Sequence, residues 1–546
     1  MSTIAEQLMA INQVKTDIAN AIQSKGVNPS GVPFTSYPFL INQIQGGSGQ
    51  TGLSSSFYNG VWSYSDYMYI LNNMTGYAYT GDEIDVSILN TVDDMLCVML
   101  DATTGASNFF GVSITTTDPE VPGANTWRID WSNQTFTEHQ NGEVVRRFLD
   151  LNETWGTHPI IKVTPINGTR FKAVNLGVEP SSVNDTRIQF ESTYLDIAFK
   201  GTVTESFTVC NPGSIVHPYL RSVFIGENMV SNFNDTFKDC KSLRRVQEFH
   251  TAHGQSFMRT FSGCISLVTI PPIDTSNCIE AVGMFEGTRS LMTVPFLNLG
   301  NLRNGGAMFY ESGIISFPDS VKFGGNTLDK TELPSMFSGC RNLKRFPVCD
   351  FTNVSNLDFF FSQCVSLEYV EAINSSSCTR FPSMFSECKK LLYGPNIDTS
   401  NAEWINDMFA YCDILESAYV NCDSLKEPMT IFRDCPCLRA VTVKGISTHW
   451  RFDTTATPFE VVKGSSNLTE IDFGGLPVYL NSVKLSGRIP AWILNNAIAN
   501  MPPYSVSEVP TVDFSSLKLD QGQIDLIAEA TILAKGYQYI PPTLVY

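Results

Sequence analysis

The sequence predicts a multidomain chain with three parts: an N-terminal helix, a β-sandwich-like domain, and a solenoid with a C-terminal cap. Three observations predict this fold class. Apolar residues at steps of three and four occur within residues 1–45. Apolar runs separated by turn residues occupy residues 57–205, and a motif that repeats at a nearly fixed period occupies residues 206–442. A chain of 546 residues is expected to form several domains rather than one hydrophobic core, because a domain averages about 150 residues.

The first element is an amphipathic helix within residues 1–45. Ser2, Thr3 and Glu6 form a capping-box start, and Gly26 and Pro29 end the helix. Apolar residues recur at steps of three and four, which favours either a helix docked on its own domain or a short parallel coiled coil, with a trimer preferred. The residues predicted to mediate this oligomerisation or docking are Ile4, Leu8, Ile11, Lys15, Ile18 and Ile22.

The order of this helix, the turn at Lys25–Val27 and the segment Tyr37–Ile41 resembles the N-terminal block of tailed-phage tail-fibre and baseplate-associated proteins. The resemblance covers residues 1–45. It implies a virion protein that is assembled in the host cytoplasm and docks onto other tail or baseplate proteins. The N-terminus shows neither the basic nor the apolar region of a secretory signal, and a virion protein, which leaves by lysis, needs none.

Residues 46–56 are a Gly/Ser linker, and residues 57–205 are predicted to form a β-sandwich or jelly roll. Their apolar runs are separated by Gly, Asn and Pro, a pattern typical of short strands. The runs expected as strands include Ile84–Ile88, Met95–Leu100, Ile160–Val163 and Ile188–Ser192.

The aromatic residues of this domain have two possible roles. Core packing is favoured for Trp127, Trp131 and Trp155. Exposed aromatic rings can instead stack on sugar rings. The candidates for glycan stacking lie nearer the edge of the domain and are Trp62, Tyr64 and Tyr67.

Nine copies of one motif follow, each with a phenylalanine, a small residue three positions later and an aliphatic residue six positions later. Subtracting successive phenylalanine positions gives 24, 24, 24, 28, 24, 24, 24 and 23. Such a period predicts a solenoid in which each coil buries its apolar side against its neighbours. The predicted core positions are Phe237, Cys240, Leu243, Phe261, Cys264, Leu267, Phe285, Leu291, Phe309, Phe337, Cys340, Leu343, Phe361, Cys364, Leu367, Phe385, Cys388, Leu391, Phe409, Cys412, Leu415, Phe432, Cys435 and Leu438.

The pattern Met-Phe-x-x-Cys-x-x-Leu, as in Met336–Leu343 and Met384–Leu391, is joined by Asp-Thr-Ser-Asn at Asp274–Asn277 and Asp398–Asn401. This combination resembles the BspA-like leucine-rich repeat of bacterial surface proteins and some phage proteins. The resemblance implies a leucine-rich-repeat solenoid that serves adhesion or display.

Seven of the fourteen cysteines occupy the small-residue position of the motif, which holds Thr288 and Ser312 in two other copies. Coils about 4.8 Å apart would hold these side chains parallel rather than facing. Buried reduced thiols are therefore favoured, and a disulfide ladder is the alternative. The other seven cysteines lack the even spacing of a disulfide scaffold.

Residues 443–546 are predicted to contain degenerate coils and a cap that closes the solenoid. Asp520 is expected to N-cap a helix over Gln521–Lys535, which Gly536 ends.

Composition and motifs argue against several functions. The formal charge of −18 disfavours nucleic acid and anionic membranes as partners, and no apolar run is long enough to insert into a membrane. Nucleotide and dinucleotide fingerprints are absent, so no cofactor is expected. His250 and His253 could bind a metal if they lay on a helix, but they lack a third ligand; no metal site and no catalytic residue are predicted.

Together these inferences predict a non-enzymatic virion protein that displays its solenoid to a host-surface glycan or protein receptor. Two alternatives stay open. A cellular BspA-like adhesin would need an export signal or a wall anchor. A glycan-degrading tail enzyme would need a pair of carboxylates at the separation used by glycosidases.

Overall fold

The structure is a computed structural model that describes residues 84–444, apart from 92–93, 102–108, 150–157, 179–192, 202, 204, 212–214, 326–328, 423 and 426–429. It also describes 459–460, 462–463, 470–472, 482–484, 491, 495, 498, 511–513, 515 and 518–544. The chain divides into two compact units, Met1–Glu83 and Ile84–Tyr546, and every described residue belongs to the second. The predicted helix in 1–45, the linker 46–56, the glycan-stacking candidates and Trp155 lie outside the described residues.

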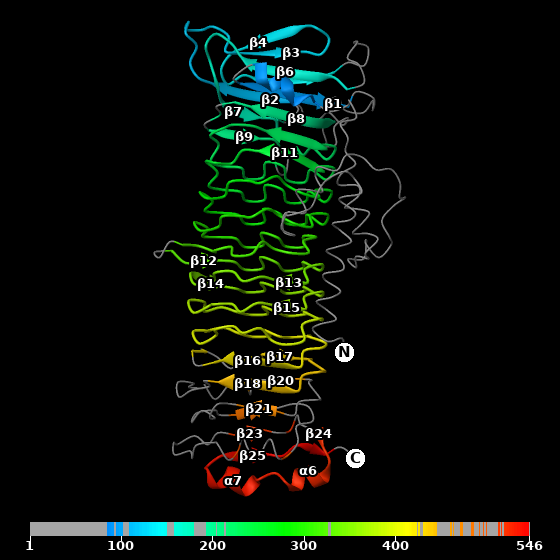
Figure 1. Cartoon of the computed structure of the whole chain (residues 1–546), viewed down its shortest axis with the longest axis vertical. Coiled ribbons are helices and arrows are strands. Elements are labelled where there is room, and N and C mark those ends of the chain that lie inside the picture. Colours follow the sequence, from blue (N-terminus) through cyan, green and yellow to red (C-terminus); the bar gives the residue numbers. More distant parts are fainter. Residues whose placement is uncertain are drawn as a thin grey trace, which may run out of the picture. The chain divides into compact units, whose positions relative to one another are not determined.

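Two β-sheets form the first part of the second unit (Figure 1). In spatial order, the first sheet is β11-β10-β8-β1-β6-β3-β4 and the second is β5-β2-β7-β9. The strands are β1 (Met95–Leu100), β2 (Phe109–Thr116), β3 (Trp127–Asp130), β4 (Phe136–His139), β5 (Val144–Phe148), β6 (Ile160–Pro165), β7 (Phe171–Asn175), β8 (Tyr194–Lys200), β9 (Ser206–Thr208), β10 (Ser222–Ile225) and β11 (Arg245–Phe249).

The two sheets face each other across a shared core, and we refer to them together as the sandwich. The Tyr194 hydroxyl of β8 donates to the Gly111 carbonyl of β2 at 3.1 Å, and the Phe199 ring of β8 lies 4.8 Å from the Phe207 ring of β9. Trp127 is buried and donates its indole N–H to the Gln140 carbonyl at 2.8 Å. Core packing is thus confirmed for Trp127 and Trp131, both of which are buried.

The prediction of a strand at Ile84–Ile88 is wrong. A 3₁₀ helix, η2 (Val86–Thr91), occupies this region. The Asp85 carboxylate accepts the Ser87 N–H at 3.0 Å, and the Asp85 carbonyl accepts the Ile88 N–H at 3.2 Å. These local bonds start a turn where alternation alone predicted an extended chain.

The first sheet leads directly into the solenoid. Strand β10 pairs in parallel with both β8 and β11, and β11 belongs to the first coil. One hydrophobic cluster extends from the sandwich residue Leu96 through the coils to Tyr537. Sandwich and solenoid therefore share a sheet and a core, while the domain boundaries proposed above stay predictions.

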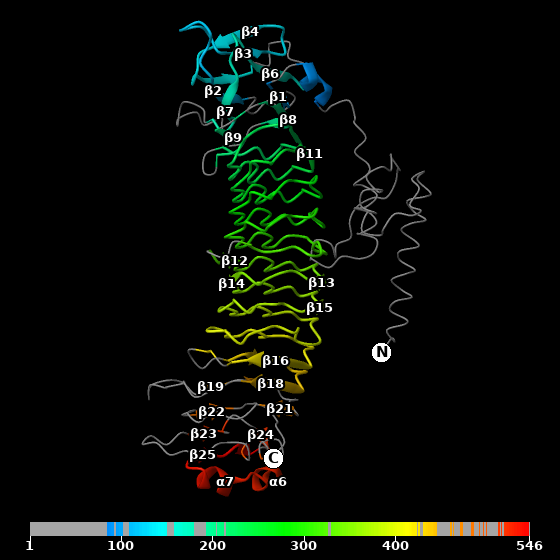
Figure 2. The same cartoon turned by 60° about the vertical axis from the view of Figure 1, so that its left-hand side comes forward.

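Each coil places its phenylalanine on that of the coil before. From Phe237 to Phe432, successive rings lie 5.2–5.9 Å apart, with interplanar angles of 4–23°. All the predicted core positions are at most 1 % exposed. The coils follow one another in chain order, as Figures 1 and 2 show from two sides.

The backbone around each repeat phenylalanine is a series of turns. Around Phe261, the N–H groups of Arg259, Phe261 and Gly263 donate to carbonyls of the next coil at 2.8–2.9 Å. The residues two before and two after the phenylalanine have a positive φ, 52° at Arg259 and 74° at Gly263. The left-handed positions after the phenylalanines are Asp239, Gly263, Gly287, Glu311, Gly339, Gln363, Glu387, Tyr411 and Asp434.

The repeat cysteines donate hydrogen bonds between coils. The Sγ of a repeat cysteine lies 2.9–3.2 Å from the carbonyl oxygen of the phenylalanine one coil earlier in the copies at Cys264, Cys340, Cys364, Cys388, Cys412 and Cys435. None of the fourteen cysteines, all of which the structure describes, forms a disulfide, and all except Cys437 are buried.

The Asp-Thr-Ser-Asn segments join the coils at a second corner. The Asp274 carboxylate accepts the Ser276 N–H at 2.9 Å and turns the chain locally. The Asn277 amide reaches the Ala252 carbonyl of the preceding coil at 2.8 Å, and Asn401 makes the same bond to the Ser376 carbonyl. The aspartate thus shapes its own coil, while the asparagine ties that coil to its neighbour.

Parallel pairing continues to the C-terminal end, from β16 to β18 and β21, and from β19 through β22 and β23 to β25. The remaining strands are β12 (Thr331–Glu332), β13 (Arg345–Phe346), β14 (Val354–Asn356), β15 (Tyr369–Val370), β16 (Ser417–Asn421), β17 (Phe432–Arg433), β18 (Ala440–Lys444), β19 (Phe459–Glu460), β20 (Val462–Lys463), β21 (Glu470–Asp472), β22 (Ser482–Lys484), β23 (Thr511–Asp513), β24 (Lys518–Leu519), β25 (Gln538–Ile540) and β26 (Thr543–Leu544).

The single helix expected over Gln521–Lys535 is wrong in one respect, because the structure has two helices, α6 (Gln521–Asp525) and α7 (Glu529–Ala534). Asp520 does N-cap α6, accepting the Gln523 N–H at 2.9 Å. Between the two helices, backbone groups bond a side chain from earlier in the chain. The Asn495 amide donates to the Leu526 carbonyl and accepts the Ala528 N–H. No helix among the described residues is long and apolar enough to span a membrane.

Candidate functional site

The strand that follows each repeat leucine sends alternate side chains outward. In β13 and β15, Phe346 and Val370 are buried while Arg345 and Tyr369 are exposed. These strands pair in parallel, with Arg345 opposite Tyr369. Outward side chains at one repeat position therefore form a column, one per coil and about 4.8 Å apart.

Three tyrosines lie on this outward surface. Tyr369 and Tyr393 are each eight residues past a repeat phenylalanine, Phe361 and Phe385, so they occupy the same column in neighbouring coils. Their exposed fractions are 50 % and 57 %. Tyr419, at 39 %, lies in β16 two residues beyond Ser417, which pairs with Tyr393. We name Tyr369, Tyr393 and Tyr419 the tyrosine face.

A carboxylate lies beside the first of these rings. The Tyr369 hydroxyl donates to the Glu371 carboxylate at 3.1 Å. This bond to the carboxylate raises the pKa of Tyr369 above its ordinary value. A tyrosine offers a flat apolar ring with one polar end, which is why such residues are enriched at binding surfaces. The tyrosine face can therefore hold a ligand by ring stacking and hydrogen bonding together.

The tyrosine face was missed from the sequence. Its members lie outside the Phe-Cys-Leu motif, and only two of the three share a repeat position. The signal was the recurrence of tyrosine eight residues after two consecutive repeat phenylalanines. The predicted oligomerisation residues, and the predicted glycan-stacking residues Trp62, Tyr64 and Tyr67, lie outside the described residues.

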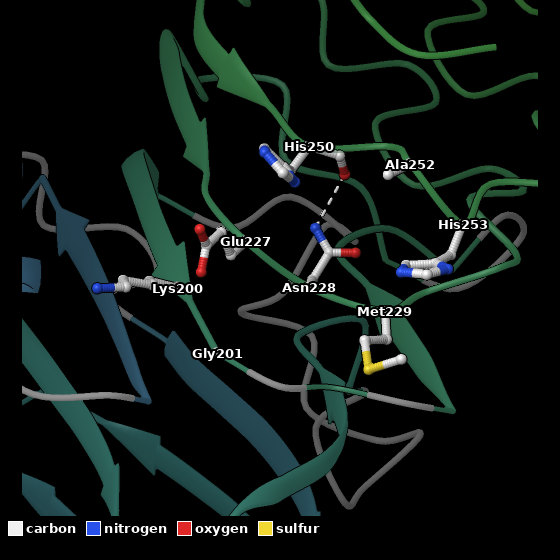
Figure 3. Close-up of a pocket in the computed structure, with 8 residues that line it drawn as sticks. All are labelled: Lys200, Gly201, Glu227, Asn228, Met229, His250, Ala252 and His253. Atoms are coloured by element: carbon white, nitrogen blue, oxygen red, sulfur yellow. Dashed lines mark hydrogen bonds between the residues drawn. The ribbon is translucent and has the colours of Figure 1, made fainter. Parts of the chain in front are cut away.

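A separate pocket of about 270 Å³ lies where the first sheet meets the first coils (Figure 3). It is lined by Lys200, Gly201, Glu227, Asn228, Met229, His250, Ala252 and His253. The sequence did not indicate that Glu227 would join the two histidines there.

The histidine pair does not form the helical metal site considered above. His250 and His253 lie in the turn that follows β11, not on a helix, and their imidazole rings lie apart in Figure 3. The Asn228 amide is engaged in structure, donating to the Gly226 and His250 carbonyls at 2.9 Å each. Within the part of the chain that the structure describes, no three His, Cys, Asp or Glu side chains are grouped to hold a metal ion.

Comparison with known proteins gives a sequence match on the repeats. A family described as Mycoplasma protein of unknown function, DUF285, matches residues 331–435, the stretch from Phe337 to Phe432. No curated protein matches.

Two solved structures are similar to parts of the chain. One is a leucine-rich repeat protein from Bacteroides ovatus, with 16 % identity and a TM-score of 0.31, covering 64 % of this chain and 81 % of that one. The other is the plant peptide hormone receptor RGFR1 in complex with RGF2, with 10 % identity and a TM-score of 0.12, covering 66 % of this chain and 99 % of the receptor. The solenoid assignment rests on this chain's own stacked coils.

Proposed function

We propose that the protein is a non-enzymatic recognition protein whose solenoid presents the tyrosine face to a glycan or protein receptor on a cell surface. The observation that carries this proposal is the exposure of Tyr369, Tyr393 and Tyr419 on consecutive coils over a fully buried core. A rigid support loses little conformational freedom when its side chains bind, so exposed aromatic rings on it are suited to contact a partner.

The test is binding of the full chain to receptor-bearing cells. The triple variant Tyr369→Ala, Tyr393→Ala and Tyr419→Ala should weaken binding at least tenfold, about 1.4 kcal/mol. Tyr219→Ala is the matched control, since Tyr219 is 51 % exposed and precedes β10, outside the coils that carry the tyrosine face. Equal affinity of the triple variant and the control would remove the tyrosine face from the proposal.

The finer proposal is a tail-fibre or baseplate-associated protein of a phage virion that docks, as a homotrimer, through its N-terminal block. It is supported by the resemblance of residues 1–45 to such blocks. Immunogold electron microscopy on a lysate of the producing culture tests it, with an antibody against the solenoid. Gold on phage tails is the expected result, whereas gold on cell envelopes would favour the alternative, a cellular BspA-like adhesin.

A glycan-degrading tail enzyme is the remaining alternative. It would release reducing sugars from isolated host envelope, and a recognition protein would bind the envelope without doing so. The same envelope preparation therefore separates the two functions.

A further inference from the structure

Two cysteines meet where the sandwich passes into the solenoid. Cys210 follows β9, the last strand of the second sheet, and Cys240 is the first repeat cysteine. Their Sγ atoms lie 3.4 Å apart, and both side chains are buried. The Cys210 N–H donates to the Thr236 carbonyl at 3.1 Å, which fixes the two segments side by side.

The surroundings of Cys240 differ from those of the later repeat cysteines. Cys264 donates to the Phe237 carbonyl of the coil before it, at 3.0 Å. Cys240 belongs to the first coil, so no earlier repeat phenylalanine stands before it; its sulfur meets the Cys210 thiol and the backbone of His217 instead. A thiol therefore faces a thiol at this position, where later copies pair a thiol with a carbonyl oxygen.

We propose that Cys210 and Cys240 are an oxidation site, which forms a disulfide when the folded protein meets a small-molecule disulfide. A thiolate of the pair attacks the small-molecule disulfide and releases one small thiol, and the second cysteine then displaces the other. One sulfur–sulfur bond forms in the protein, its two thiols lose two protons and two electrons, and the reagent is reduced to two thiols. The sulfurs must close to about 2.05 Å, which requires a rotation of the two side chains.

The crosslink would tie the sandwich to the solenoid. It closes a loop between residues 30 apart in sequence and restricts the unfolded chain, which stabilises the folded one. Burial raises the pKa of the Cys240 thiol and shields both sulfurs from a reagent. Oxidation of the native protein therefore requires local opening of this junction and is slow. The pair would stay reduced in a reducing cytoplasm and oxidise outside it.

The experiment uses the full chain incubated with oxidised glutathione at mildly alkaline pH, followed by thiol blocking and non-reducing peptide mapping. We expect one crosslinked peptide joining Cys210 to Cys240, and a higher Tm than in the reduced protein. Cys240→Ser should abolish both results. Cys264→Ser is the matched control, because it occupies the same repeat position but faces a carbonyl oxygen, and it should keep both.

Both serine variants are expected to fold, since Ser312 and Thr288 fill this position in natural copies. Cys210→Ala provides a second variant without the crosslink. The proposal is overturned if Cys210 and Cys240 of the oxidised wild-type protein are both alkylated after denaturation, or if Cys240→Ser retains the rise in Tm. The mapping needs only the wild-type chain, so its result stands even where a variant does not fold.

Discussion

At the residue scale, the repeat cysteine is a hydrogen-bond donor as well as a small side chain. Cys388 reaches the Phe361 carbonyl of the preceding coil at 3.2 Å. In the copy with threonine, the shorter Thr288 side chain bonds the carbonyl of its own Phe285 at 2.6 Å. The long C–S bond thus allows cysteine to join two coils, whereas the Thr288 hydroxyl bonds within its own coil. The Ser312 hydroxyl, at the same repeat position, lies 3.4 Å from the Cys340 sulfur of the next coil.

This role predicts an order of stability among variants of Cys388. Cys388→Ala removes both packing and the donor, and should lower the free energy of unfolding by about 1–2 kcal/mol. Cys388→Ser retains a donor and should cost less. Chemical denaturation checks the order, with Cys437→Ser as a control at the cysteine that is not fully buried. A serine variant that loses as much as the alanine variant would show that the position needs only volume.

His217 predicts a loss of stability in mild acid. Burial lowers its pKa to about 4, while its Nε2 lies 2.7 Å from the Val209 carbonyl and its ring stacks on Tyr194 at 4.4 Å. The unfolded chain has an ordinary histidine pKa near 6.5. Below pH 6.5 the unfolded state therefore binds a proton that the folded state excludes, and stability falls until about pH 4.

The His217 contribution amounts to about 3 kcal/mol between these pH values. His217→Gln keeps a side-chain donor for the Val209 carbonyl but does not titrate. We expect the variant to have a flatter dependence of unfolding free energy on pH between 6.5 and 4. Parallel curves for the two proteins would assign the acid sensitivity to other groups.

At the element scale, each coil depends on a left-handed residue two positions after its phenylalanine. Glycine occupies this position at Gly287, with φ 67°, while Glu387 adopts φ 61° in a later coil. A side chain with a Cβ is strained in this region, and a β-branched one more so.

Two opposite substitutions test this backbone requirement. Gly287→Val should lower the free energy of unfolding by about 1–2 kcal/mol, whereas Glu387→Gly should be neutral or stabilising by up to about 1 kcal/mol. Thermal unfolding of both variants provides the measurement. Destabilisation by Glu387→Gly beyond that of Gly287→Val would mean that side-chain contacts, not φ, govern this position.

The elements also show which features the sequence could predict. The repeat period located every phenylalanine of the stack from Phe237 to Phe432, because each must meet its equivalent in the next coil. The left-handed positions could not be predicted from the sequence. Gly263, Glu311 and Tyr411 share a positive φ but have side chains of different kinds. The break between α6 and α7 depends on Asn495, a residue from an earlier coil, and no local pattern reports such a contact. The tyrosine face combines different repeat positions, and only the stacked coils bring it together.

At the scale of the whole unit, the repeat phenylalanine of each coil stacks on those of the coils on either side, so damage to one coil should stay local. The Phe309 ring lies 5.3 Å from Phe285 and 5.2 Å from Phe337, in the coils on either side. Phe309→Ala should cost about 3–5 kcal/mol in local stability. In a solenoid, such a loss opens the adjacent coils first and decreases with distance.

Hydrogen exchange followed by mass spectrometry tests this expectation. Amide exchange should rise most between residues 285 and 337 and fall away in both directions, while β1 and β8 of the sandwich keep their protection. Phe296→Ala, at an exposed phenylalanine, should leave the pattern unchanged. A uniform rise from β1 to β25 would instead mean that the continuous core couples the sandwich and all the coils into one cooperative unit. Whether the coils open locally or unfold together matters for recognition. Local opening would let coils near the tyrosine face adapt to a receptor while the junction with the sandwich stays folded.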